Sequence, residues 1–213
     1  MKRINKLILI LLILFISTFL VSCVKVVKTG EEDKLIGNVK FDPNANVSEF
    51  WDTSFLPELK DKALDLSDLY NKANGDFKNV SDLGLYTMGD KGELNFTIKD
   101  EATVIENLSD KKAGYLVLSV DDIPSDIVIE LQVGPIFKGT SIRDNLECIN
   151  FDDYVNQIEW GGVSHSLNEK VLETVINEDI LNLNVGDTID LYGCFTVSSN
   201  GEIIITPISL EVK

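Results

Sequence analysis

Apolar and polar residues alternate along much of the second half of the chain, in the period-two pattern that is typical of half-buried β-strands. The first run begins with Leu94, Phe96 and Ile98. The runs cover residues 94–108, 116–120, 127–133, 188–197 and 202–212. The segment SSNGE, at 198–202, is a turn signal between the last two runs. The pattern therefore predicts three strands, a long connection and two further strands.

The residues before the first strand show helical spacing instead. Asn46 and Glu49 have the spacing of a capping box, Pro57 suits the first turn of a helix, and Gly75 is a typical helix stop. Apolar residues recur three and four positions apart between these signals. Two or three short helices are therefore expected between residues 41 and 76.

The long connection between the third and fourth strands contains two further helix signals. Residues 151–160 are expected to form a turn or two of helix, which Gly161 and Gly162 would end. Ser166 and Glu169 match a second capping box. An apolar stripe follows, at Leu167, Val171, Val175 and Ile176. The main helix of the connection is therefore expected to begin at Ser166.

Three strands, a helix and two strands occur in the same order in the OB-fold, a five-stranded, partly open Greek-key barrel. The predicted fold class is therefore mainly β with helices (α+β): an OB-like barrel with one inserted helix, preceded by a short helical segment. An antiparallel sheet with a helix packed on one face has the same order and is the alternative. Pro207 lies in the last strand, which predicts an edge or a bulge there, because proline has no backbone N–H.

The amino terminus has the pattern of a secretory signal, in which the basic segment MKRINK precedes an uncharged apolar run from Leu7 to Val21. The run is shorter than the ~20 residues of a membrane-spanning helix. It ends in LVSC, at residues 20–23, which resembles a bacterial lipobox. We expect cleavage after Ser22 and attachment of a diacylglycerol to the Cys23 thiol. An uncleaved signal anchor is the alternative, and both interpretations place the rest of the chain outside the cytoplasm.

The chain is thereby divided into four parts. Residues 1–22 are the expected lipoprotein signal peptide, and residues 23–40 are the lipidated cysteine with a charged tether. Residues 35–41 could add a short strand. Residues 41–90 are expected to form a helical segment packed on the barrel, and residues 91–213 the barrel domain.

The chain is strongly acidic, with 35 Asp and Glu residues against 19 Lys and Arg residues. Three of the basic residues, Lys2, Arg3 and Lys6, lie in the signal, so the mature chain keeps 16 and has a formal net charge of −19. Such a surface repels nucleic-acid phosphates and anionic lipid head groups. Nucleic acid is therefore not expected as a partner, and the lipid on Cys23 is expected to hold the protein at the membrane.

Two cysteines remain once Cys23 is lipidated. Export from the cytoplasm permits a disulfide between Cys148 and Cys194. Each lies among apolar neighbours, however, where cysteine commonly behaves as a small buried hydrophobe. Their spacing along the chain cannot establish the geometry that a disulfide requires. Two buried, reduced thiols are the favoured interpretation, and a disulfide is the alternative.

Three segments carry a resemblance to a known family. They are FDPNANVSEFWDTSFLPEL at 41–59, LQVGPIFKGTSIRDNL at 131–146 and INFDDYVNQIEWGGVSHSLNEKV at 149–171. In these segments the chain resembles the DUF2291 family of predicted periplasmic lipoproteins, and the resemblance covers nearly the whole mature chain. Its most specific part is the Gly-Pro and Gly-Thr-x-x-Arg-Asp pattern, with the Asn-Gln that follows. The resemblance implies a lipoprotein with an OB-like barrel, in a family that is frequently encoded beside sugar ABC-transporter genes. It supplies no established activity and no catalytic residues.

The segment that leaves the third strand, GPIFKGTSIRD from Gly134 to Asp144, contains candidate binding residues. Its two glycines would permit positive backbone dihedrals, Thr140 or Ser141 could cap a following helical turn, and Ser141 with Asp144 fits a capping box. Arg143 could make bidentate hydrogen bonds to a carboxylate, a phosphate or a pair of sugar hydroxyls. The favoured interpretation is structural, with a strand-to-helix turn in which Arg143 and Asp144 form ion pairs.

Asn156 and Gln157 supply amide donors and acceptors, which suit sugar hydroxyls and also the backbone groups of an irregular segment. With Arg143 and Asp144, they are expected to gather near one edge of the barrel as ligand- or partner-binding residues. His165 is the single histidine, so a metal site is not expected. No Gly-x-Ser-x-Gly pattern is present. No cofactor and no catalytic residues are therefore predicted.

These features predict a non-enzymatic lipoprotein on the outer side of the cell membrane or facing the periplasm. It is expected to be an accessory or ligand-binding module of a sugar ABC-type uptake system, with a permease or a solute-binding protein as its partner. A hydrolase or transferase that acts on envelope glycans is the alternative. An enzyme of that kind needs a pocket that contains carboxylates with unusual pKa values.

Overall fold

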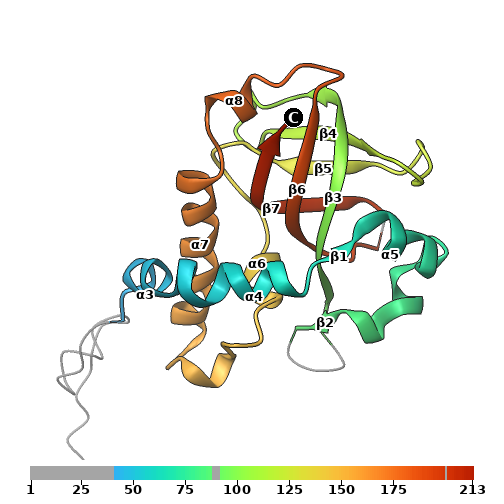
Figure 1. Ribbon diagram of the computed structural model, residues 1–213. Coiled ribbons are helices and arrows are strands. Elements are labelled where there is room, and N and C mark those ends of the chain that lie inside the picture. Colours follow the sequence, from blue (N-terminus) through green and yellow to red (C-terminus); the bar gives the residue numbers. More distant parts are fainter. Residues whose placement is uncertain (1–40, 88–91, 200) are drawn as a thin grey trace, which may run out of the picture. The chain divides into compact units, whose positions relative to one another are not determined.

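The computed structural model describes residues 41–87, 92–199 and 201–213 (Figure 1). Residues 42–213 form one compact unit. The predicted signal peptide, Cys23, the tether and the strand expected from residue 35 lie outside the described residues, as does the predicted boundary at residues 90 and 91. No helix in the described part of the chain combines the length and the apolar character needed to cross a membrane.

Five strands close into a barrel, as Figure 1 shows. They are β3 (Leu94–Asn107), β4 (Tyr115–Val120), β5 (Ile129–Gln132), β6 (Thr188–Thr196) and β7 (Ile203–Val212). They pair in the order β3-β4-β5-β7-β6, and β6 returns to pair with β3. Only the β5–β7 pair among these is parallel. The order β6-β3-β4-β5 is that of a Greek key, so the predicted OB-like barrel is confirmed.

The last strand bends at its proline. Gly193 of β6 lies opposite Pro207, but the preceding Tyr192 lies opposite Ser209, so Ile208 is an extra residue in β7. β7 pairs with β5 only through residues 203–205. Pro207 thus lies at a bulge and beyond the β5 pairing, where its missing N–H is tolerated. The prediction for Pro207 is confirmed.

The barrel core continues into the segment that precedes it. α5 (Leu66–Ala73) and the 3-10 helix η2 (Phe77–Leu83) contribute buried side chains to the same cluster as the strands. The ring of Phe77 lies 5.0 Å from that of Phe195 and 5.8 Å from that of Phe96. Two-residue strands flank these helices: β1 (Leu64–Asp65) pairs with β3 in parallel, and β2 (Leu85–Tyr86) pairs with it in antiparallel fashion.

The first helices run from residue 43 to residue 61. They are α3 (Pro43–Phe50), the π-helix η1 (Trp51–Phe55) and α4 (Leu56–Asp61). The Asp42 side chain caps α3 by accepting hydrogen bonds from two backbone N–H groups, so the capping box predicted at Asn46 is wrong. Pro57 lies in the first turn of α4, as predicted. α5 ends where Asn74 and Gly75 adopt positive φ values of 51° and 80°, which confirms the stop at Gly75.

The long connection forms α6 (Ser141–Asp144), the 3-10 helix η3 (Phe151–Asp153), α7 (Gln157–Thr174) and α8 (Glu178–Leu181). The predicted break at Gly161 and Gly162 and the predicted start at Ser166 are both wrong, because α7 is continuous from Gln157. α7 packs beside α3, and a Cβ atom on Gly162 would lie 2.8 Å from Cγ of Pro43. The small residue therefore permits close helix packing. α6 contacts β3, β6 and β7.

Candidate functional site

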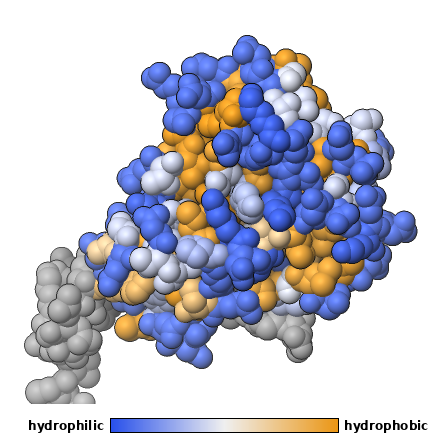
Figure 2. Space-filling model, viewed as in Figure 1, coloured by the Kyte–Doolittle hydropathy of each residue, from blue (hydrophilic) through white to orange (hydrophobic). Residues whose placement is uncertain are grey.

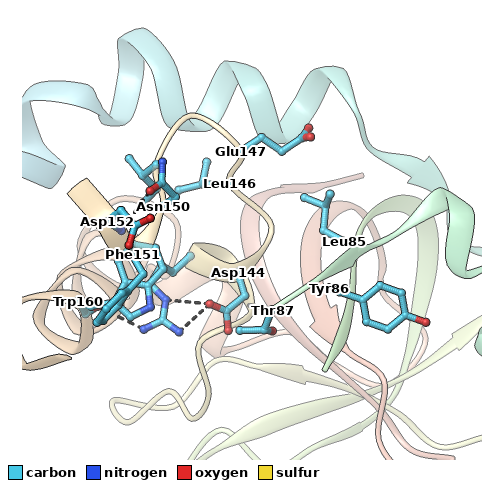
Figure 3. A pocket seen from close by; sticks show the side chains of 12 residues that line it. Leu85, Tyr86, Thr87, Asp144, Leu146, Glu147, Asn150, Phe151, Asp152 and Trp160 are labelled. Carbon is cyan, nitrogen blue, oxygen red and sulfur yellow. Dashed lines mark hydrogen bonds and ion pairs between the residues drawn. The ribbon is translucent and has the colours of Figure 1, made fainter. Parts of the chain in front are cut away.

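A pocket of about 550 Å³ lies beside the barrel, between β2 and the segment that runs from α6 to the start of α7. Its lining residues are Leu85, Tyr86, Thr87, Arg143, Asp144, Leu146, Glu147, Ile149, Asn150, Phe151, Asp152 and Trp160. Figure 3 shows Phe151 and Trp160 on one side, Leu85 and Tyr86 on the other, and Asp144 between them. The pocket therefore joins residues from two segments that are far apart in the sequence.

Buried polar groups fix the short helix that carries one wall of the pocket. The Ser141 hydroxyl contacts the carbonyl oxygen of Cys194 at 3.3 Å and Oγ1 of Thr206 at 3.0 Å, which ties α6 to β6 and β7. Gln132, at the end of β5, donates to Thr206 Oγ1 at 2.8 Å and accepts from the backbone N–H of Lys138 at 2.7 Å. The loop between β5 and α6 is thus held to the barrel at several points.

One glycine and the predicted capping box of this loop differ from expectation. Gly139 has a positive φ of 86°, as predicted. Gly134 does not have a positive φ; instead, a Cβ atom there would lie 2.1 Å from the backbone nitrogen of Gly114. Thr140 is the N-cap residue, and its hydroxyl donates to Asp144 Oδ2 at 2.5 Å. The box predicted from Ser141 to Asp144 is therefore wrong.

Arg143 and Asp144 form a buried ion pair at the pocket wall. The guanidinium donates to Asp144 Oδ1 from Nε at 2.8 Å and from Nη2 at 2.6 Å. The side chains are 9% and 2% exposed, respectively. This geometry agrees with the structural interpretation of the pair, because each charge is neutralised by its neighbour.

Trp160 covers the same arginine. The guanidinium carbon of Arg143 lies 4.4 Å from the centre of the Trp160 ring, and Nη1 donates to the Trp160 carbonyl oxygen at 3.2 Å. Phe151 and Tyr154 contact the indole, with ring centres at 6.3 Å and 5.1 Å. The start of α7 is therefore joined to α6 by a cation–π contact and to η3 by aromatic packing.

A second ionic contact holds the loop between α6 and η3. Glu58 of α4 accepts hydrogen bonds from the backbone N–H groups of Glu147 at 2.6 Å and Cys148 at 3.2 Å, and from Lys62 Nζ at 3.1 Å. Lys62 also donates to the carbonyl oxygen of Asn145. Burial alone would raise the pKa of Glu58, but bonds from Cys148, Glu147 and Lys62 outweigh it and lower that pKa.

The two remaining cysteines are free thiols in different surroundings. Cys194 is buried, whereas Cys148 is an exposed residue, so the prediction of burial is wrong for Cys148. Desolvation raises the pKa of the Cys194 thiol to about 12. Desolvation of its sulfur, together with the neighbouring Glu58 carboxylate, raises the pKa of the Cys148 thiol to about 12 as well. Neither thiol is activated as a nucleophile at neutral pH.

The remaining candidates lie outside the pocket lining. Asn156 is the N-cap residue of α7, and its side chain accepts from the backbone N–H groups of Ile158 and Glu159 at 2.9 and 3.0 Å. Gln157 is exposed in the first turn of the same helix. His165 has a side chain that is 75% exposed and lies 3.2 Å from Glu169. Among the described residues, no group of three or more His, Cys, Asp or Glu side chains could hold a metal ion.

Sequence reasoning missed most of the pocket. Trp160 and Phe151 lay in a segment expected to be a short helix. Leu85 and Thr87 lay in the part of the expected helical segment 41–90 for which no individual helix or strand was predicted. The signal available in the sequence was the presence of Phe151 and Trp160 within 20 residues of Arg143 and Asp144, which could have indicated that they share a site.

The carboxyl groups with raised pKa values lie elsewhere. Burial is the main cause at Asp100 on β3 and at Glu130 on β5. At Asp100, hydrogen bonds from the backbone N–H groups of Ser67 and Glu101 offset part of that effect. Neither residue is among those that line the pocket.

The closed five-stranded barrel with preceding helices makes this an α+β protein of the OB-fold class. A solved structure supports this assignment: the crystal structure of an OB-fold protein from Thermotoga maritima is similar with a TM-score of 0.64 and 18% identity, covering 82% of this chain and 100% of that chain. The family of predicted periplasmic lipoproteins known as DUF2291 matches residues 13–211, and the chain belongs to that family. No curated protein matches the chain.

Family membership makes the chain a predicted periplasmic lipoprotein that is held at the membrane by its lipid. The location predicted from the sequence is therefore confirmed. Hydrophilic residues cover much of the face seen in Figure 2, consistent with the strongly acidic composition.

Proposed function

We propose that this lipoprotein is a non-enzymatic binding module that assists a sugar ABC-type uptake system from the outer side of the membrane. The observation that carries the proposal is the pocket beside the barrel, in which a rigid ion pair and an aromatic wall are presented by fixed elements. Ligand sites combine apolar walls with a few placed polar groups in this way. The transporter link comes from the family resemblance described above.

Two exposed apolar residues in the segment that lines the pocket support a protein partner. Val155 and Ile158, at the start of α7, are 77% and 76% exposed. They lie within a few residues of Phe151 and Trp160, which line the pocket. Exposed apolar residues at interaction sites commonly contact a partner protein. A transporter subunit that contacts Val155 and Ile158 would bind the same segment that carries Phe151 and Trp160.

The rival function, an enzyme that acts on envelope glycans, has less support in this site. Hydrolysis of a glycosidic bond commonly uses one carboxylic acid with a raised pKa as the proton donor. Within the described residues, the carboxyl groups with raised pKa values are those of Asp100 and Glu130, and neither residue lines the pocket. Incubation of the full chain with envelope glycans, followed by analysis of the products, would reveal such an activity.

The direct experiment is purification of the full-length lipoprotein from its native membranes in a mild detergent, with identification of the proteins that accompany it. We expect a permease or a solute-binding protein of a sugar transporter. Ile158→Ser should reduce the recovered partner by about tenfold, the change that ~1.4 kcal/mol of binding free energy produces.

Val185→Ser is the matched control. Val185 is 68% exposed but lies between α8 and β6, beyond the other end of α7. α7 has 18 residues and is therefore about 27 Å long. The control should leave the partner in place. Absence of any transporter component from the native purification would contradict the proposed function.

A further inference from the structure

Arg143 does not give the pocket a free positive charge. Its guanidinium makes two hydrogen bonds to one carboxylate oxygen of Asp144, and both side chains are at least nine-tenths buried. Asp144 is in turn fixed by the Thr140 hydroxyl. A phosphate or carboxylate that approached Arg143 would have to compete with this internal anion. The pair therefore presents a dipole to the pocket rather than a cationic site.

Hydrogen-bond donors nevertheless remain at this wall. A guanidinium has five N–H groups. The described residues accept three hydrogen bonds from Arg143, two at Asp144 and one at the Trp160 carbonyl oxygen. Two N–H groups of this lining residue therefore have no acceptor among the described residues, and neutral oxygen atoms of a ligand could accept from them.

The rest of the described lining adds acceptors and negative charge. Glu147 and Asp152 are exposed carboxylates, and Arg143 is the one basic residue in the described lining. The lining thus holds one guanidinium and three carboxylates, with Asp144 included, and Glu147 Oε2 also lies 3.9 Å from Lys62 Nζ. An anionic ligand would be repelled by the excess of carboxylates, whereas hydroxyl groups could donate to Asp152 and accept from Arg143.

Apolar groups complete the pocket. Trp160, Leu85 and Ile149 supply an aromatic and two aliphatic surfaces around the polar atoms. A ligand with an apolar C–H face and a rim of hydroxyl groups would satisfy both kinds of surface. We propose that the pocket binds an uncharged polyhydroxylated ligand of the neutral-sugar class and discriminates against carboxylates and phosphates. This inference rests on the proposed binding function and names the ligand class of the same site.

Tryptophan fluorescence can test the inference on an intact pocket. The chain has two tryptophans, and Trp51 is buried in η1 at 2% exposure. Trp51→Phe leaves Trp160 as the single reporter. The full-length lipoprotein in detergent would be titrated with the neutral probes D-glucose, D-xylose and myo-inositol, and with the charged probes D-glucuronate and glucose 6-phosphate.

We expect at least one neutral probe to change the Trp160 emission in a saturable way, and the charged probes to require at least about tenfold higher concentrations. Trp160→Phe, which keeps Trp51, should lose the response. Charged probes that bind as well as or better than the neutral ones would overturn the inference. A flat titration with all three neutral probes into the millimolar range would overturn it too.

Asp144→Asn tests the charge argument separately. If the variant folds, the positive charge of Arg143 is no longer balanced, and the preference for neutral probes over D-glucuronate should shrink by about tenfold or more. A folded variant with unchanged discrimination would contradict the argument. The titrations contain no transporter, so they are independent of the native purification. If the neutral probes do not bind but a transporter component is purified with the protein, only the ligand class is wrong. If the neutral probes bind but no transporter component is purified, only the transporter link is wrong.

Discussion

The carboxylate of Glu58 on α4 accepts a hydrogen bond from the backbone N–H of Glu147 at 2.6 Å, across 89 residues of sequence. The same carboxylate bonds to Cys148 and Lys62. The helical segment that precedes the barrel therefore holds the loop that contributes Leu146, Glu147 and Ile149 to the pocket. Pocket shape depends on this contact as well as on the barrel.

Glu58→Gln should lower the free energy of unfolding by about 2 kcal/mol, because hydrogen bonds to a partly buried charge are lost. The pKa of Glu58 is lowered in the folded chain from its ordinary value of 4.5. Its stabilising contribution is thus fully present above pH 4.5 and is lost as the pH falls through the folded pKa. Denaturant unfolding of the full chain in detergent, measured from neutral to acidic pH, checks both effects.

Glu169→Gln is the control for this change. The Glu169 side chain is 43% exposed and pairs with the exposed His165, so its loss should cost less than about 0.5 kcal/mol. Below pH 4.5, native stability should fall more steeply than that of Glu58→Gln. If the free energy of unfolding of the native protein and that of Glu58→Gln fall in parallel as the pH is lowered, the role assigned to Glu58 is wrong.

The two free thiols should react differently with an alkylating reagent. Cys194 is buried and should be protected in the folded chain. Cys148 is exposed but has a pKa raised to about 12, so it should react slowly at neutral pH. Glu58→Gln removes the nearby negative charge and should accelerate alkylation of Cys148. Mass spectrometry after timed alkylation measures this, and both thiols should react in the unfolded chain without reductant.

Arg143→Ala should lower the free energy of unfolding by about 3 kcal/mol, because it strands the buried Asp144 carboxylate. Replacing both residues, with Arg143→Met and Asp144→Leu, removes both charges and should cost less than the single change. Thermal unfolding of the two variants provides the comparison. A single variant that melts like the native protein would show that the pair has no structural role.

Cys23→Ala tests the membrane anchor. Lipid attachment requires the Cys23 thiol, so the variant should lose palmitate incorporation and leave the precursor uncut or miscut. Two or more acyl chains, at ~0.8 kcal/mol per buried methylene, anchor a protein stably. The expected result is checked by labelling cells with palmitate and fractionating them. A variant that still incorporates the label and stays with the membranes would overturn the lipobox interpretation.

The barrel could be predicted from the sequence because each strand carries its own alternating pattern. Pro207 also carried local information, since proline is restricted to edges and bulges. The course of α7 could not be predicted in this way. Gly162 packs closely against Pro43, which is far away in the sequence, so the reason for a glycine here is not visible in its own segment. Ser166 resembled a cap, but its hydroxyl bonds to Asn44 of α3.

The candidate site could be predicted only where its contacts are local in the sequence. Arg143 and Asp144 are neighbours in the sequence, so their pairing could be anticipated from the two residues alone. The opposite wall comes from β2, a two-residue strand that forms only by pairing with β3. The hydrogen bond between the Glu147 backbone N–H and the Glu58 carboxylate likewise depends on tertiary packing. Contacts of this range leave no periodic signal in the sequence.

Site-specific photo-cross-linking in native membranes tests the central claim most directly. A photoreactive amino acid would replace Ile158 in one full-length chain and Val185 in another, and the cross-linked proteins would be identified by mass spectrometry. The account predicts an adduct with a sugar-transporter permease or solute-binding protein from position 158 and none from position 185. Failure to capture a transporter component at position 158, or equal capture from both positions, would contradict it.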